Sequence, residues 1–218
     1  LSGKKGIIMG VANDHSIAWG ISQQLANEGA ELCFTYQGES LERRVKPLAE
    51  SINNDFLIEC DVLKDGSIKD SFKLIEERWG TIDFILHSIA FSNKDELKGK
   101  YLNTSRENFS NTMLISCFSF TEVAHEAERL MKNGGSMVTL TYDGSQKYIR
   151  NYNVMGVAKA ALESSVRYLA ADLGPSNIRV NALSAGPMKT LAMAGISGGK
   201  DMMKWSEKNS LMNRNINL

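Results

Sequence analysis

The sequence predicts a single α/β domain in which helices cover both faces of a doubly wound parallel sheet. Six apolar runs of strand length recur along the 218 residues, and amphipathic stretches of helix length separate them. Strands that alternate with helices form parallel sheets, because each helix returns the chain to the same edge. The sequence contains no internal repeat, linker or low-complexity tract. We therefore expect one domain over residues 1–218.

The individual elements follow from these patterns. The expected strands are Gly6–Met9, Glu31–Tyr36, Asp55–Cys60, Ile82–His87, Ser136–Leu140 and Ile178–Leu183. The expected amphipathic helices are Ile17–Glu28, Ile68–Trp79, Phe109–Lys132 and Val154–Leu173. A solvated helix with mixed charges is expected over Glu39–Glu50. Because parallel crossovers are right-handed, the carboxyl ends of the strands should line one edge of the sheet, where ligands bind.

Composition excludes several classes of protein. Acidic and basic residues balance at 25 each, so the chain offers no cationic field for nucleic acid or for an anionic membrane. No apolar run reaches the ~20 residues that span a bilayer, and the first residues lack the layout of a signal peptide. Cys33, Cys60 and Cys117 lie far apart and are odd in number, which argues against disulfides and a zinc site. We expect a soluble cytoplasmic protein without a metal.

The end of the chain differs from the rest. Residues 188–208 are rich in Met, Gly and Lys and follow the last expected strand, which predicts a mobile lid. No further strand-like run occurs before Leu218. We therefore expect that a closing strand of the sheet is missing from this sequence.

The loop after the first strand suits a dinucleotide in a Rossmann-like fold. Gly10 permits a tight turn, Ser16 is placed to cap the next helix, and the first-turn amides of that helix would face a pyrophosphate. Only Gly10 and Gly20 remain of the usual glycine fingerprint. An ordinary strand-to-helix connection is the alternative.

Polar residues after the second and third strands suit the adenosine half of such a cofactor. Gln37 takes the place at which many NAD proteins carry an acidic residue for the ribose. Asp61 could meet the adenine amino group, with Val62 against the ring; alternatively, Asp61 caps the next helix. Arg43 and Arg44 could hold a 2′-phosphate, but the stretch around them has the mixed charges of a solvated helix. NADH is therefore favoured over NADPH.

A tyrosine and a lysine seven residues apart are the candidates for chemistry. At roughly 100° per residue, Tyr152 and Lys159 would project from one face of a helix, two turns apart. A nearby lysine cation would lower the pKa of the phenol and could also bind a sugar hydroxyl. Tyr142 ends the preceding strand-like run. The alternative is an exposed lysine beside a packed tyrosine.

Several motifs together resemble one family in register from Leu1 to Leu218. They are Gly10 to Gly20, Cys60-Asp61-Val62, His87-Ser88-Ile89-Ala90-Phe91, Leu140-Thr141-Tyr142, Asn151 to Gly156 through Lys159, and Ala185 to Ala192. The chain resembles bacterial NADH-dependent enoyl-acyl-carrier-protein reductase, a divergent short-chain dehydrogenase/reductase. Ordinary members of that larger family place the tyrosine four residues before the lysine, where this chain has Met155, which cannot donate a proton.

The resemblance implies that NADH reduces the carbon-carbon double bond of a trans-2-enoyl thioester on acyl carrier protein, in fatty-acid elongation. It implies that Tyr152 stabilises the thioester oxygen, that Lys159 holds the nicotinamide ribose and that Tyr142 borders the acyl chain; a core-edge aromatic is the alternative for Tyr142. Ser92 would lie beside the substrate, and the protein would be a homotetramer. The implied cofactor contacts are Gly10, Ser16, Ile17, Gln37, Asp61, Val62, Ile89, Lys159, Met188, Lys189, Thr190, Leu191 and Ala192.

The implied lid would line the acyl pocket with Met193, Ile196, Met202 and Met203, although a Met-rich stretch is also typical of plain core. Arg150, Asp143 and Met9 depart from the family's usual residues, and none of them removes a catalytic group. Two other functions stay open. A carbonyl or alcohol dehydrogenase of the same fold is disfavoured by Met155, and a non-catalytic NAD-binding protein is disfavoured by the presence of all three candidate catalytic side chains.

Overall fold

All six expected strands form one parallel sheet. The computed structural model describes residues 1–194 and 198–217, with only the backbone at Ala192 and Lys200; Ile196 of the expected lid and Leu218 lie outside this part. The strands are β1 (Lys5–Met9), β2 (Glu31–Tyr36), β3 (Leu57–Glu59), β4 (Phe84–His87), β5 (Gly135–Thr141) and β6 (Ile178–Ser184). They pair in the order β3-β2-β1-β4-β5-β6. The order reverses between β1 and β4, which is the point at which such sheets bind ligands.

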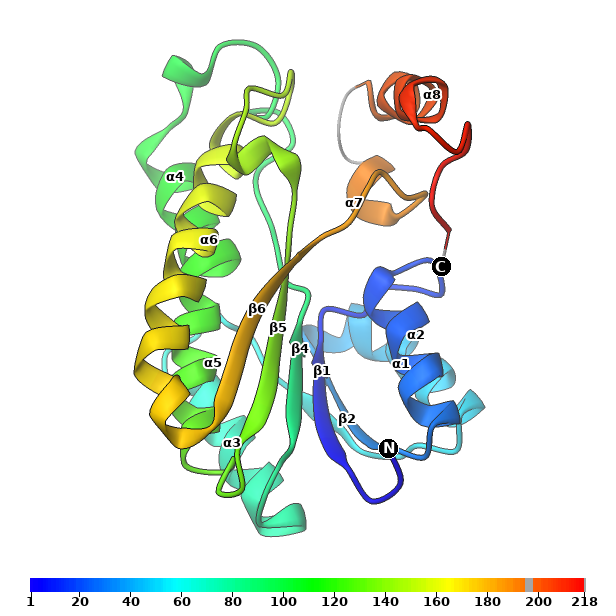
Figure 1. Ribbon diagram of the computed structural model, residues 1–218. Coiled ribbons are helices and arrows are strands. Elements are labelled where there is room, and N and C mark those ends of the chain that lie inside the picture. Colours follow the sequence, from blue (N-terminus) through cyan, green and yellow to red (C-terminus); the bar gives the residue numbers. More distant parts are fainter. Residues whose placement is uncertain (195–197, 218) are drawn as a thin grey trace.

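The sheet is covered on both faces, as the sequence predicts (Figure 1). Alternate residues of β1 point to opposite faces: Ile7 and Met9 join one core cluster and Ile8 joins the other. One face carries α3 (Ser67–Trp79), α4 (Arg106–Met113), α5 (Ser119–Glu128) and α6 (Asn153–Leu173), and the other carries α1 (Ile17–Asn27) and α2 (Gly38–Ser51). The doubly wound α/β fold is therefore confirmed.

The helix expected over Phe109–Lys132 differs in detail. It begins earlier, at Arg106, because the Ser105 side chain accepts a hydrogen bond from the Asn108 amide at 3.1 Å and caps it. A π-helical turn over Leu114–Phe118 then separates α4 from α5. Such turns are frequent at functional sites, and this one adjoins the site described below.

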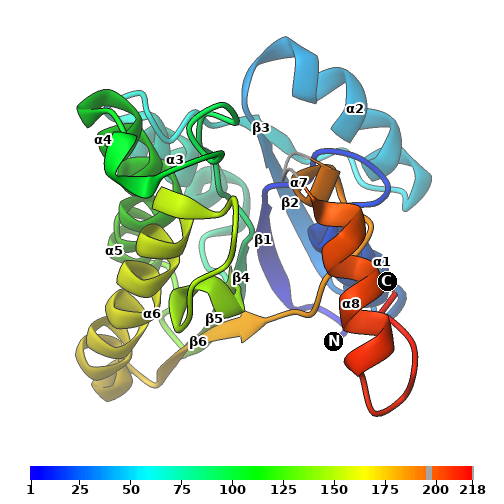
Figure 2. The same ribbon diagram turned by 90° about the horizontal axis from the view of Figure 1, so that it is seen from above.

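Two helices form in the segment expected to be a lid. They are α7 (Leu191–Ala194) and α8 (Gly199–Asn209). Seen from above, they lie over the carboxyl edge on the side of α1 and α2, across from α4 and α6 (Figure 2). The chain then returns to α8, where the Asn215 amide donates to the Met203 carbonyl at 3.1 Å. None of the helices described is long and apolar enough to cross a membrane.

Candidate active site

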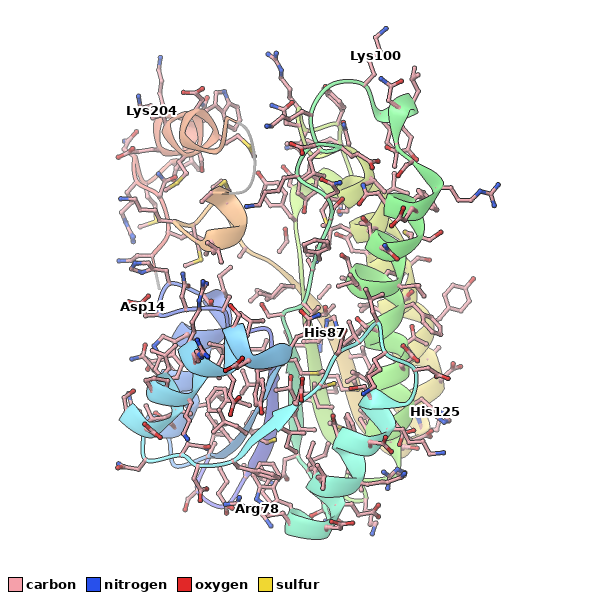
Figure 3. The ribbon with its side chains drawn as sticks, turned by 180° about the vertical axis from the view of Figure 1, so that it is seen from behind. Asp14, Arg78, His87, Lys100, His125 and Lys204 are labelled. Carbon is pink, nitrogen blue, oxygen red and sulfur yellow. The ribbon has the colours of Figure 1, made fainter. Side chains whose placement is uncertain are left out.

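The predicted site residues follow the carboxyl ends of the strands. Figure 3 shows His87, which ends β4, inside the molecule, with Lys100 and Lys204 at one end and Arg78 at the other. The loops that carry the candidate cofactor and catalytic residues all leave the sheet at the end marked by Lys100 and Lys204. A ligand at this edge can therefore touch residues from several strands at once.

The loop after β1 is built around Gly10 and Ser16. Gly10 has φ +98, and a Cβ there would lie 2.1 Å from the Ser88 carbonyl oxygen of the neighbouring loop. Ser16 stands at the N-cap position just before α1, as expected, but its hydroxyl does not cap the helix in the part of the chain described. It instead accepts hydrogen bonds from the Ala12 and Asn13 amides at 3.0 and 3.1 Å. Ser16 therefore folds the loop back on itself before α1 begins.

Gly10→Ala should destabilise the protein by at least about 2 kcal/mol, because it combines left-handed backbone strain with a steric clash. Gly66→Ala is the matched control, since Gly66 has φ +79 but open space around its Cβ position. Denaturant unfolding of both variants would measure the difference. Equal losses would show that the approach of Ser88 to Gly10 contributes nothing.

The two residues predicted for adenosine meet each other. The Gln37 amide, after β2, donates to the Asp61 carboxylate, after β3, at 3.2 Å. Asp61 also accepts from the Leu63 amide at 3.0 Å, and α3 begins after Gly66, so Asp61 does not cap that helix. Arg43 is paired with Glu39 on the exposed side of α2. The structure thus brings together a polar pair suited to a ribose and an adenine edge.

Tyr142 and Tyr152 pack against each other after β5. Their ring centroids lie 5.4 Å apart, in an edge-to-face arrangement of 71°. Gly144 makes room for the Tyr152 ring, since a Cβ at Gly144 would lie 2.5 Å from it. Sequence analysis missed this role of Gly144, because the two residues are eight positions apart across an irregular loop. Tyr142 therefore does more than pack at the edge of the core, because it also contacts the other candidate catalytic tyrosine.

Tyr152 and Lys159 are both buried, at 7% and 6% exposure, so the alternative of an exposed lysine is wrong. Tyr152 stands just before the first residue of α6 instead of within the helix. The Lys159 ammonium donates to the Leu140 carbonyl at 2.7 Å. Burial lowers the pKa of Lys159 to about 8, partly opposed by Cys117 and Glu163.

The expected lowering of the Tyr152 pKa is wrong. Burial is the main cause of the opposite effect, with Tyr142 adding to it, so the pKa of Tyr152 is raised above its ordinary value. Lys159 directs its ammonium to a backbone carbonyl. The Tyr152 hydroxyl is therefore protonated at neutral pH and can donate a hydrogen bond.

The loop after β4 places Ile89 and Ser92. Ile89 is half-buried and packs on the main core cluster, as Val62 does. Ser92 is buried, and its hydroxyl lies 3.2 Å from the side-chain oxygen of Asn108 on α4. This bond braces the loop against α4. Contact of Ser92 with a substrate stays a prediction.

After β6, the chain passes through Met188 to α7. Met188 is buried, while Lys189 and Leu191 are exposed. The Thr190 hydroxyl accepts a hydrogen bond from the Met193 amide at 3.1 Å and caps α7. Among the residues described, its own proton has no acceptor and can be donated to a phosphate oxygen. The Ala192 side chain, expected to contact the cofactor, lies outside the described part.

His87 was quoted in the sequence motifs but given no role there. It is fully buried at the end of β4, with Nδ1 3.1 Å from the Thr139 hydroxyl and Nε2 2.9 Å from the Ser119 hydroxyl. Ser119 donates its single proton to the Ile115 carbonyl at 2.7 Å, so we assign the ring proton to Nε2. His87 therefore ties β4 and β5 to the first residue of α5, directly after the π-helical turn. A histidine inside an apolar strand was the only sequence signal for it.

Stability should fall with acidification because of His87. Burial, and then the charge of Lys159, lowers the pKa of His87 from 6.5 to about 3. Between these values the unfolded chain takes up a proton that the folded protein does not, so the free energy of unfolding should fall by up to about 1.4 kcal/mol per pH unit. His87→Gln should remove this component from the pH dependence of denaturant unfolding. The exposed His125 provides the control substitution, and an identical pH dependence in His87→Gln and the parent would contradict the assignment.

Comparison with known proteins places these features in a family. A profile described as Enoyl-(Acyl carrier protein) reductase matches residues 10–218. The chain is 61% identical to Enoyl-[acyl-carrier-protein] reductase [NADH] 2 of Rhizobium meliloti (strain 1021), covering 100% of this chain and 81% of the relative. It is 57% identical to the FabI enzyme of Rickettsia prowazekii (strain Madrid E), covering 99% and 83%.

Solved structures agree. The crystal structure of FabI from Candidatus Liberibacter asiaticus matches with a TM-score of 0.97 and 57% identity, over 99% of this chain and 84% of that one. The reductase from Anaplasma phagocytophilum, solved in complex with NAD, matches with a TM-score of 0.95 and 52% identity, over 99% and 82%. The chain belongs to the enoyl-(acyl carrier protein) reductase family.

Proposed function

We propose that the protein reduces the carbon-carbon double bond of trans-2-enoyl-acyl-carrier-protein with NADH, as a step of fatty-acid elongation. One observation carries this proposal beyond family membership. The buried tyrosine that contacts Tyr142 is Tyr152, whereas the position four residues before Lys159 holds Met155, which packs in the same cluster. The site therefore has a hydroxyl donor displaced from the place that carbonyl reduction uses.

The residues at the carboxyl edge fit NADH. Gln37 and Asp61 would hold the adenosine, the loop from Gly10 through Ser16 to Ile17 would receive the pyrophosphate, and Ile89 with Val62 would provide apolar contacts. Met188, Lys189, Thr190, Leu191 and Ala192 would cover the nicotinamide side. When bound, the dihydronicotinamide supplies a hydride to the β-carbon of the enoyl thioester.

The chain's own groups would stabilise the charge that then develops. The Tyr152 hydroxyl would donate to the thioester oxygen of the enolate, as an oxyanion hole does. Lys159 has three N–H donors, and in the described part of the chain one of them is used, on the Leu140 carbonyl. Lys159 can therefore also bind ribose hydroxyls and keep the local potential positive. Tyr142 would border the thioester, and Ser92 would lie beside the substrate.

One assay distinguishes the enoyl reductase from the two alternatives, a carbonyl dehydrogenase and a non-catalytic NAD-binding protein. NADH absorbance would be followed after addition of a trans-2-enoyl thioester or, separately, a ketone of similar chain length. We expect turnover of the enoyl thioester. Faster turnover of the ketone would favour a carbonyl dehydrogenase, and binding of NADH without any turnover would favour a non-catalytic protein.

The proposal also covers the oligomeric state of the protein, its location and the lid over the site. The protein would be cytoplasmic and homotetrameric. Large exposed side chains on the π-helical turn and on α6, namely Leu114, Phe118, Val157 and Tyr168, support contacts between subunits. Light scattering on the eluting protein would test it. Helices α7 and α8 would form the substrate lid, with Met193, Met202 and Met203 partly buried.

A further inference from the structure

One carboxylate holds the loop that carries Tyr142. Glu163 lies on α6, one turn after Lys159, and its side chain accepts a hydrogen bond from the Thr141 hydroxyl at 2.6 Å. The same oxygen accepts from the Ser145 hydroxyl, and the other oxygen accepts from the side-chain amide of Gln146 at 3.5 Å. The donors lie on both sides of Tyr142 in the sequence. Glu163 therefore joins the end of β5 to the loop that follows it.

The carboxylate is held in its charged form. Partial burial opposes ionisation, but hydrogen bonds from Ser145, Thr141 and Gln146 outweigh it and lower the pKa of Glu163 below its usual value. Glu163 is therefore ionised at neutral pH, and hydrogen bonds to an ionised acceptor are stronger than neutral ones. A carboxylate on a solvated helix surface needs no such partners, whereas Glu163 is half-buried and accepts hydrogen bonds from three side chains.

This loop also determines where Tyr152 lies. Gly144 belongs to the turn between Tyr142 and Ser145 and lies against the Tyr152 ring. A shift of the turn would therefore displace both tyrosines. We propose that Glu163 is a positioning residue, whose carboxylate fixes residues 141–146 so that Tyr142 and Tyr152 are aligned for the enoyl thioester. This inference rests on the proposed roles of those tyrosines.

The charge of Glu163 also reaches Lys159. The titratable groups that face Lys159 are His87 from β4, Cys117 from the π-helical turn and Glu163 from α6 itself. His87 is neutral, whereas the negative charge of Glu163 favours the ammonium against burial. Removing that charge should lower the pKa of Lys159 further. Activity that needs the ammonium should then be lost at a lower pH than in the parent.

Two substitutions of Glu163 separate its effect on the position of residues 141–146 from the effect of its negative charge. Glu163→Ala removes both, and we expect kcat with an enoyl thioester to fall about tenfold, as the loss of hydrogen bonds to a charged group implies. Glu163→Gln keeps an oxygen for Thr141 and Ser145, so we expect it to retain most of kcat but to shift the basic limb of the pH profile to lower pH. Glu126→Gln on α5 is the matched control, because Glu126 also accepts from a neighbouring side chain, Arg129, away from β5.

A second measurement does not depend on catalysis. The backbone amides of Ser145 and Gln146 donate to the carbonyls of Tyr142 and Asp143, respectively. Hydrogen exchange at these two amides should become faster in Glu163→Ala but not in Glu126→Gln. Unchanged exchange, or faster exchange with an unchanged kcat and pH profile, would overturn the inference. After such a result for Glu163→Ala, the Tyr142→Phe and Tyr152→Phe variants would show which proposal is wrong. Unchanged turnover in both variants would contradict the proposed roles of the tyrosines. Impaired turnover in them would contradict only the role of Glu163.

Discussion

Replacing Tyr152 with phenylalanine should lower kcat for enoyl reduction by about 10²-fold, the usual cost of removing one oxyanion-hole donor. Phenylalanine keeps the ring that packs on Tyr142 and Gly144, so the fold should be preserved. NADH binding should change little, since only the hydroxyl is lost. Stopped-flow or steady-state loss of NADH absorbance, together with NADH titration by fluorescence, would separate the two effects.

Tyr168→Phe is the control for this substitution, because Tyr168 lies on α6, the helix that follows Tyr152, but is exposed. It should behave as the parent does. If Tyr152→Phe kept the parental kcat, the Tyr152 hydroxyl would not be the group that stabilises the thioester oxygen, and Tyr142 would become the candidate.

Replacing Lys159 with methionine should weaken NADH binding by about 10- to 100-fold, the effect of losing hydrogen bonds from one charged donor. Methionine has a similar shape and fills the buried site without a charge, so the protein should fold. In the parent, NADH affinity should be constant below pH 8 and decrease above it, because the lowered pKa of about 8 means that the ammonium is lost there. Titration of NADH across this range would reveal the dependence on one proton.

The exposed Lys132 provides the control, since Lys132→Met removes a positive charge at a distance from the site. That variant should bind NADH as the parent does. NADH affinity that stayed normal in Lys159→Met, or that did not change between pH 7 and pH 9, would show that Lys159 does not hold the cofactor.

The sequence was enough to predict the sheet because its signals are local. Each strand is an apolar run of the right length, and each loop that carries Gly10, Gln37, Asp61 or Tyr142 follows directly from one. Burial patterns along a strand are visible in the sequence itself. The position of the candidate residues at the carboxyl edge then follows from parallel topology alone.

What could not be predicted depends on contacts between distant residues. His87 meets Ser119 and Thr139, and Glu163 meets Thr141, through hydrogen bonds that span 22 or more positions. Tyr152 was expected to share one helix face with Lys159, and its pKa was expected to be lowered, because spacing reveals direction but not burial. In the structure, burial dominates at both Tyr152 and Lys159 and moves their pKa values in opposite directions, since it disfavours a phenolate and an ammonium alike.

The most direct test of hydride transfer to a carbon-carbon double bond is to follow the label from NADH that carries deuterium at the transferred position. The protein would be given a trans-2-enoyl thioester, and the product would be examined by mass spectrometry and NMR. We predict a saturated thioester with one deuterium on the β-carbon and a solvent proton on the α-carbon. Deuterium on a carbonyl carbon, or an unsaturated thioester recovered without label, would contradict the function assigned to this site.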